Sequence, residues 1–454
     1  MVLLTPPLTY GCAITTGLSV EASIFACLML ATLLLWVHRL VDEFVAPLVA
    51  IVGSLFVGLA PPKIALSGFA SPSMLLLVGI FALSATISAS GLSYRLILQL
   101  LIRLPDQSRW HQLTLLGAGY LLSPIVPSAN TRVALLTPAY KSILDALRLP
   151  RGGMETTALL AALFSGSRLF GPMMATSRSF NIAAIGFLPP QLQIEFNGLF
   201  WLVAALAALA VVTSAHLLIT PRLFPEGHRN PLLREDLRQT LIGLGKLSTT
   251  EWTAALCFLL FALGSATTSW HHLEAHVLAG CVLLALLISG TMQKKDFRRS
   301  IDWPQIFFLM GIDSMVKIMD YLGLQESLAT SVQNRFEFIH GNIIVFIAVA
   351  LIVTIAMRLA LPVTAGAISA TVILLPIAQA QSINPWIVVF CATMFTDITF
   401  FRYQGTNGLL QLYSDGVIDD VNEGRFLAHV KWINIAIVAA VLASIPWWNA
   451  LDIL

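Results

Sequence analysis

Polar residues interrupt the most apolar parts of this chain at four places. The segments are "SANT" at 128–131, "PVTAGAISAT" at 362–371, "GPMMATSRSFN" at 171–181 and "FFRYQGTNG" at 400–408. A helix that stops inside an apolar environment exposes N–H groups, which favour anions, and carbonyls, which together with hydroxyl oxygens suit cations. These residue types therefore indicate binding of a small anion beside a small cation. A packing role stays open, because Ser and Thr in membrane helices often bond only to the preceding turn or to a neighbouring helix.

Composition identifies the elements that must position these segments. Of the 454 residues, 57% are hydrophobic and 11% are charged, against about 25% charged in a typical soluble domain. Many apolar runs approach the ~20 residues that a spanning helix needs, and strand-like alternation is lacking. The sequence predicts an all-α polytopic membrane protein with about 11 spans. We expect these near 18–38, 43–60, 73–88, 86–104, 154–190 (broken), 198–220, 251–268, 274–291, 304–322, 386–410 (broken) and 427–448.

Two further apolar stretches, 111–147 and 340–381, are each interrupted halfway. We interpret them as reentrant hairpins, because each half is judged too short to cross the hydrocarbon core. Basic residues gather in the loop 221–250 and in "QKKDFRR" at 293–299, and basic loops mark the cytoplasmic side. The N-terminus is then predicted to be cytoplasmic, in what we take to be a bacterial inner (plasma) membrane. Residues 230–246 read as an amphipathic cytoplasmic helix.

A sequence repeat relates the two halves. "PSMLLLVGIFALSATISASGLSYRL" begins at Pro72 and "PQIFFLMGIDSMVKIMDYLGLQESL" at Pro304. Each copy has glycines seven and nineteen residues after its proline, and each is followed by an interrupted hairpin and a broken span. Two such halves favour two inverted repeats with a solute site between them, as in transporters. An enzyme is not expected, since no nucleophile–base pair, metal cluster or nucleotide loop is seen, and we expect no cofactor, metal or nucleic-acid partner.

The four polar segments resemble the motifs of a known family. "SANTRVALLTP" and "ISATVILLPI" are similar to the hairpin-tip motifs of the divalent anion:sodium symporters, the dicarboxylate, citrate and sulfate carriers of the ion transporter superfamily, and "TSRSFN" and "GTNG" resemble their loops. The resemblance implies a homodimer in the lipid membrane that moves a small anionic solute by an elevator mechanism, with Na⁺ as coupling ion. It divides the chain into scaffold helices (1–110), first hairpin plus broken helix of a transport domain (111–190), span and linker (191–250), scaffold of the second repeat (251–335), second hairpin plus broken helix (336–412) and final span (413–454).

The resemblance also implies the site residues. For the substrate these are Ser128, Asn130, Thr131, Thr364, Ser369, Thr176 and Thr406, and for a cation they are Asn130, Asn181 and Asn407. From the charges of the loops, and not from the resemblance, we add Arg178 and Arg402 as substrate-binding residues and Asp397 as a coupling residue.

Departures from the family pattern bear on the coupling ion. The first tip has an extra Ala129, the second tip has no Asn, and each loop gains an arginine, Arg178 or Arg402. A fixed guanidinium repels Na⁺ and binds carboxylates, so we hypothesise reduced or absent sodium coupling. Alternatively, Arg402 forms a structural pair with Asp397, or a dehydrated Asp397 carries a proton.

Other ionisable residues have less specific interpretations. Asp313 and Lys317 are expected to pair at i,i+4. Arg132, Arg168 and Arg358 are either further site candidates or snorkel to an interface. Six histidines, expected at interfaces, are His38, His216, His271, His272, His276 and His340. A different solute, such as an oxyanion or a lipid-linked biosynthetic intermediate, and a non-transport sensor or assembly subunit stay open as alternatives.

Overall fold

The computed structural model describes residues 19–150, 152–196, 199–225, 233–324, 327, 342–399 and 422–454. Within these residues the regular elements are helices, and no strand occurs. Seven of the described helices are long and apolar enough to cross a membrane. The prediction of an all-α, multi-pass membrane protein is confirmed.

The helices of the first half follow the predicted spans closely. They are α2 (Val20–Val37), α3 (Val45–Val57), α4 (Pro62–Ala65), α5 (Pro72–Ser90), α6 (Leu92–Arg103), α7 (Ser108–Leu122), α8 (Ala129–Leu147), α9 (Met154–Arg168), α10 (Ser179–Ile185), α11 (Pro190–Phe196) and α12 (Leu199–Leu223).

The linker and the second half follow in the same way. Their helices are α13 (Leu233–Gly243), α14 (Thr249–Ala266), α15 (Thr268–His271), α16 (Ala275–Ile288), α17 (Lys294–Arg299), α18 (Trp303–Tyr321), α20 (Ile343–Ala360), α21 (Val363–Ala380), α22 (Pro385–Phe395), α24 (Glu423–Ala443) and α25 (Ile445–Ala450).

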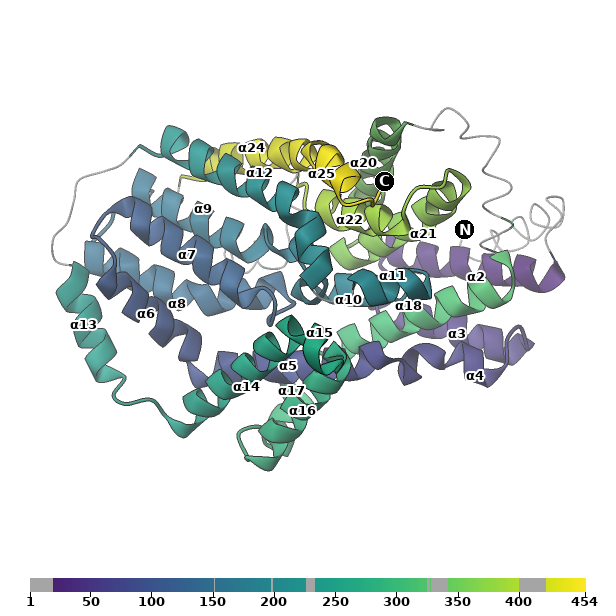
Figure 1. The fold of residues 1–454 in the computed structure, drawn as a ribbon, viewed down its shortest axis with the longest axis horizontal. Coiled ribbons are helices and arrows are strands. Elements are labelled where there is room, and N and C mark those ends of the chain that lie inside the picture. Colours follow the sequence, from purple (N-terminus) through teal and green to yellow (C-terminus); the bar gives the residue numbers. More distant parts are fainter. Residues whose placement is uncertain are drawn as a thin grey trace.

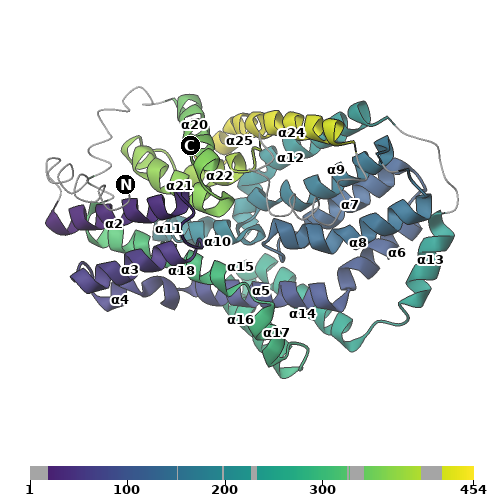
Figure 2. The same cartoon turned by 180° about the vertical axis from the view of Figure 1, so that it is seen from behind.

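The two halves repeat the same pattern of helix packing. In this pattern α5 corresponds to α18, α3 to α16 and α2 to α14. α5 packs against α16 and α18 packs against α3, while α2 packs against α3 and α14 packs against α16. In the first half α7 and α8 contact α9, and in the second half α20 and α21 contact α22. Figures 1 and 2 show α6–α9 and α13 at one end of the long axis and α2–α4 at the other. This arrangement agrees with the repeat found in the sequence.

The repeated glycines have matching structural roles. Gly79 lies so close to Ala279 that a Cβ would approach its carbonyl oxygen to 2.4 Å, and at Gly311 a Cβ would approach Pro47 to 2.7 Å. Gly91 (φ 74°) and Gly323 (φ 66°) lie in the left-handed region just after α5 and α18. Because only glycine adopts this conformation at no steric cost, the repeat marks the ends of two equivalent helices.

Both interrupted stretches form the predicted hairpins, but their arms are longer than expected. The first hairpin is α7 and α8, and the second is α20 and α21. The arms of the second hairpin have 18 residues each, long enough by themselves to count as candidate spans. The expectation that each half is too short to cross is therefore wrong for residues 343–380, although the break between the arms is where it was predicted.

The predicted span at 86–104 also differs from the structure. α6 has only 12 residues, which at 1.5 Å per residue gives about 18 Å, well below the roughly 30 Å of a hydrocarbon core. One face of α6 carries Arg95, which is buried and paired with Glu251 of α14 at 2.6 Å. The same guanidinium donates hydrogen bonds to the carbonyls of Leu244 and Gly245. α6 is therefore a short helix to which the linker between the halves is anchored.

Candidate functional site

The breaks of the two hairpins open onto one cavity of about 810 Å³. The first hairpin contributes residues 127–130, and the second contributes Pro362, Val363, Thr364 and Ala367. The broken-helix segment contributes Arg178, Ser179 and Phe180. The sequence motifs at the two hairpin tips, more than 200 residues apart, thus meet at a single site.

Two helix N-termini border this cavity. α8 begins after Ser128, whose side-chain oxygen accepts a hydrogen bond from the Thr131 N–H at 3.3 Å. α21 begins after Pro362, whose side chain supplies no hydrogen bond to the first turn. N–H groups of a helix's first turn lack partners within the helix and carry partial positive charge. Both hairpin tips therefore favour an anion in the cavity.

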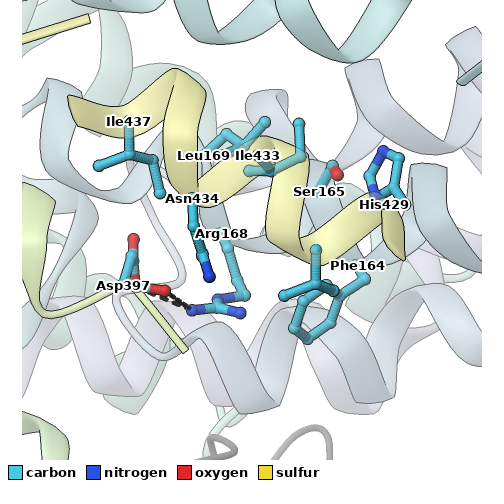
Figure 3. Close-up of a pocket in the computed structure, with 10 residues that line it drawn as sticks. Phe164, Ser165, Arg168, Leu169, Asp397, His429, Ile433, Asn434 and Ile437 are labelled. Carbon is cyan, nitrogen blue, oxygen red and sulfur yellow. Dashed lines mark hydrogen bonds and ion pairs between the residues drawn. The ribbon is translucent and has the colours of Figure 1, made fainter. Parts of the chain in front are cut away.

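Asp397 lies at the floor of the cavity between two arginines. Arg178, just before α10, approaches it at 2.5 Å, and Arg168, at the end of α9, approaches it at 3.4 Å. Arg168 also donates to the Asp397 backbone carbonyl at 2.6 Å. Figure 3 shows Arg168 in contact with Asp397 below α24 in the view, where Arg168, Asp397 and Asn434 line a second, water-sized cavity of about 20 Å³.

Positive charge exceeds negative charge in the buried cluster around Asp397. Arg132, Arg168 and Arg178 are all buried, with relative exposures of 0%, 6% and 9%. Among the described residues, Asp397 forms ion pairs with Arg168 and Arg178, whereas Arg132 has no carboxylate partner. Buried charges are costly unless they are compensated. The cluster, of which Arg178 and Asp397 line the cavity, therefore has a residual positive charge that an anionic solute would neutralise.

The opposite wall of the cavity comes from the loop between α2 and α3 and from the start of α18. It includes Arg39, Asp42, Glu43 and Asp302. Burial raises the pKa of the Glu43 carboxyl; Arg39 opposes this shift and Asp302 adds to it. This wall is the more acidic one, so an anion is expected at the hairpin tips rather than at this side.

The structure brings together five of the predicted site residues. Ser128, Asn130, Thr364, Arg178 and Asp397 line the cavity.

Four other predicted residues lie elsewhere. Asn181 is buried, donates to the carbonyls of Gly171 and Met174, and accepts from the Thr393 hydroxyl. Its side chain therefore ties the broken-helix loop to α22, and a cation-binding role of Asn181 stays a prediction. Thr131 does not line the cavity. Two buried hydroxyls, those of Thr176 and Ser369, have no hydrogen-bond partner within the described part of the chain. Three further predicted residues, Arg402, Thr406 and Asn407, lie outside the described residues.

Several interpretations of charged residues change. The described partners of Asp397 are Arg178 and Arg168, distant in sequence, and the proposed pair with Arg402 lies outside the described residues. The two guanidinium groups compensate the charge of this carboxylate, and a proton-carrying role of Asp397 stays a prediction.

The snorkelling alternative is wrong for Arg132, Arg168 and Arg358, which are buried within the protein. His216 was also expected at an interface, but it is buried against His429 at 3.2 Å, between α12 and α24. The expected pair of Asp313 and Lys317 is confirmed, at 3.0 Å.

Sequence reasoning missed the wall formed by Trp36, Arg39, Glu43 and Gln305. Trp36 lies near the end of a predicted span, the other three lie between spans or at the start of one, and together they form no motif. The sequence contained one weak indication of this wall. Several ionisable residues follow α2, although a simple turn between two spans needs none.

Comparison with known proteins agrees with this geometry. The chain is 24% identical over 253 residues to a membrane protein of Cupriavidus necator, covering 55% of this chain and 49% of the relative. It is 23% identical over 322 residues to the inner membrane protein YbhI of Escherichia coli and 20% identical over 316 residues to the putative malate transporter YflS of Bacillus subtilis. Each of these two alignments covers 68% of this chain and 66% of the relative. The chain thus spans about half to two thirds of the length of these relatives.

The fold is also that of a solved transporter, YdaH of Alcanivorax borkumensis. The TM-score is 0.56 at 17% identity, and the match covers 86% of this chain and 88% of that chain. The profile of the citrate transporter family matches residues 31–445, nearly the whole sequence. These findings confirm the resemblance to the divalent anion carriers. The chain belongs to the citrate transporter family.

Proposed function

We propose that the protein is a secondary transporter for a small anion of the di- or tricarboxylate class, located in a bacterial inner membrane. The observation that carries this proposal is the cavity between two hairpin tips, where two helix N-termini and a residual positive charge converge. The cavity volume of about 810 Å³ lies within the range typical of small-molecule sites. The citrate transporter profile and the name of the putative malate transporter favour polycarboxylates among small anions.

The two walls of the cavity suggest how the solute would cross. One wall consists of the hairpin tips and the broken helix, and the other of the α2–α3 loop, Phe81 of α5 and the start of α18. An elevator mechanism requires such a division, because the solute moves with one wall past the other. We propose that α7–α10 and α20–α22 form the moving part, that two copies associate through their scaffold helices, and that sodium coupling is reduced or absent.

Thermal unfolding of the purified protein tests this function. Citrate, malate, succinate and sulfate should be compared, each in sodium and in choline salts. A ligand at a hundred times its Kd adds about 2.7 kcal/mol to the free energy of unfolding. A response to polycarboxylates is expected, and a response to sulfate alone would move the substrate class to oxyanions. No response to any anion would contradict the proposal.

Asn130→Asp provides a site-directed version of the same test. A carboxylate at the first hairpin tip would repel the bound anion, and its Kd should rise at least about tenfold, equivalent to about 1.4 kcal/mol. Asn342→Asp is the matched control: Asn342 is the exposed N-cap of α20, at the far end of the second hairpin from its tip. An aspartate also caps a helix well, so anion binding should not change there.

A further inference from the structure

Arg132 has an unusual set of partners for a fully buried arginine. Its guanidinium donates hydrogen bonds to the backbone carbonyls of Ser167 at 2.8 Å and Ser177 at 3.1 Å, and to that of Val126. No ion pair joins it to a carboxylate within the described residues. The positive charge is therefore compensated mainly by carbonyl dipoles.

These carbonyls come from three breaks in the helical structure. Val126 precedes α8 at the first hairpin tip, Ser167 lies in the last turn of α9, and Ser177 lies in the loop before α10. Carbonyls of unwound backbone and of helix C-terminal ends are the ligands that coordinate Na⁺ in transporters with broken helices. A cation-binding group of oxygens is thus present at the first hairpin tip, and a side chain of the protein fills it.

The second hairpin tip has a related contact. Arg358, in the last turn of α20, is 6% exposed and borders the cavity. It donates to the carbonyl of Leu361, which immediately follows α20, at 3.4 Å. At each hairpin tip, therefore, a guanidinium group donates to backbone carbonyls next to the break between helices. Arg132 follows the first tip in the chain, in α8, whereas Arg358 precedes the second tip, in α20.

We propose that the guanidinium of Arg132 permanently takes the place of a coupling cation at the first hairpin tip, so that the tip binds its anion without Na⁺. The inference rests on the proposed function and specifies its coupling. Arginine stays charged in essentially any environment, and its planar group has five donors that can satisfy several carbonyls at once. A Na⁺ ion at the same oxygens would meet this charge at close range and be repelled.

The test compares wild type with Arg132→Ala in two measurements. The first is thermal stabilisation by NaCl relative to KCl and choline chloride with no anion present. The second is the Kd of citrate or malate in NaCl and in choline chloride. Removing the guanidinium leaves the carbonyls of Val126, Ser167 and Ser177 available to Na⁺. Arg222→Ala is the matched control, because Arg222 also donates to a backbone carbonyl but is exposed.

In wild type and in the control, Na⁺ should give no specific stabilisation and should change the anion's Kd less than about twofold. In Arg132→Ala, Na⁺ should stabilise specifically and tighten anion binding by about tenfold, within the usual range of coupling between sites. Arg132→Lys keeps the charge and should stay insensitive to Na⁺. Specific stabilisation of wild type by Na⁺ overturns the inference, whether or not Arg132→Ala folds. A folded Arg132→Ala without a response to Na⁺ also overturns it.

The outcomes separate this inference from the proposed function. If no anion binds to wild type, the proposed function fails, whereas the NaCl measurement without anion still decides the role of Arg132. If anions bind to wild type only in the presence of Na⁺, the proposed function stands and the inference fails.

Discussion

Replacing Asp397 with asparagine should have opposite effects on stability and on anion affinity. Asp397 lies between Arg178 at 2.5 Å and Arg168 at 3.4 Å, and all three side chains are buried. At about 4 Å between charge centres and an effective dielectric constant of about 20, each attraction is about 4 kcal/mol. Removing one partner of a buried pair typically costs 3–5 kcal/mol, roughly, because the remaining charge is left uncompensated. We expect Asp397→Asn to lose about this amount of unfolding free energy.

Anion binding should become tighter in the same variant. A carboxylate about 8 Å from a bound anion repels it by about 2 kcal/mol at an effective dielectric constant of about 20. Its removal should lower the anion's Kd more than about tenfold. Thermal unfolding and anion titration of the purified variant measure the two quantities. Arg178→Gln should lower both stability and affinity, and the double variant should recover part of the stability by restoring the balance of charge.

A purely structural role for Asp397 predicts a different result, in which stability and affinity fall together. Unchanged stability in Asp397→Asn would equally refute the reasoning. Asp313→Asn is the control, because Asp313 pairs with a Lys317 side chain that is 38% exposed. Asp313 itself is only 5% exposed, but the Lys317 side chain that loses its partner is not buried, so the loss of stability should be smaller than in Asp397→Asn, and the control should leave anion affinity unchanged.

Two further predictions concern the linker and the pH dependence of stability. Arg95→Met should lose about 3–5 kcal/mol of unfolding free energy because it leaves the Glu251 carboxylate buried and without its arginine. Thermal unfolding measures this loss, and the double variant with Glu251→Gln should recover part of it. An unchanged stability of Arg95→Met would contradict the anchoring of the linker. The pKa of the Glu43 carboxyl is raised in the folded protein, with burial the largest cause. The protonated form therefore favours folding, and its contribution, complete below the unfolded pKa of about 4.3, is lost as pH rises through the raised pKa. Stability measured across this range should depend less on pH in Glu43→Gln, and an identical profile would show that Glu43 does not contribute.

The helices could be predicted from the sequence because their signals are local. Apolar runs of spanning length, prolines at helix starts and glycines at helix ends gave most boundaries to within a few residues, as for α5 and α18. α6 was misjudged, because an apolar face 12 residues long reads as part of a span until the partner of Arg95 is known. Each half of 340–381 was expected to be too short to cross, whereas the break occupies only residues 361–362 and leaves two arms of 18 residues.

The site was predictable only where its residues form motifs. Ser128, Asn130 and Thr364 were identified because hairpin tips have a recognisable composition. The partner of Asp397 was sought nearby, at Arg402, whereas Arg168 and Arg178 are more than 200 residues away and reach it through the packing of the two broken helices. The hydrogen-bond partners of Arg132 could not be predicted either, because they are backbone carbonyls, which every residue has.

The excess of guanidinium groups in the buried cluster around Asp397 has an electrical consequence. Arg132, Arg168 and Arg178 against Asp397 give a formal charge of +2 among the described residues of this cluster. If the hairpins and the broken helices move across the membrane as proposed, a bound dianion cancels the charge of this cluster during the loaded movement. When the moving part returns without a solute, it must carry the two positive charges of this cluster through the membrane potential, at about 2.3 kcal/mol per charge for each 100 mV. An inside-negative potential would hold the empty site facing inwards, and so would favour exchange of one dianion for another over net uptake.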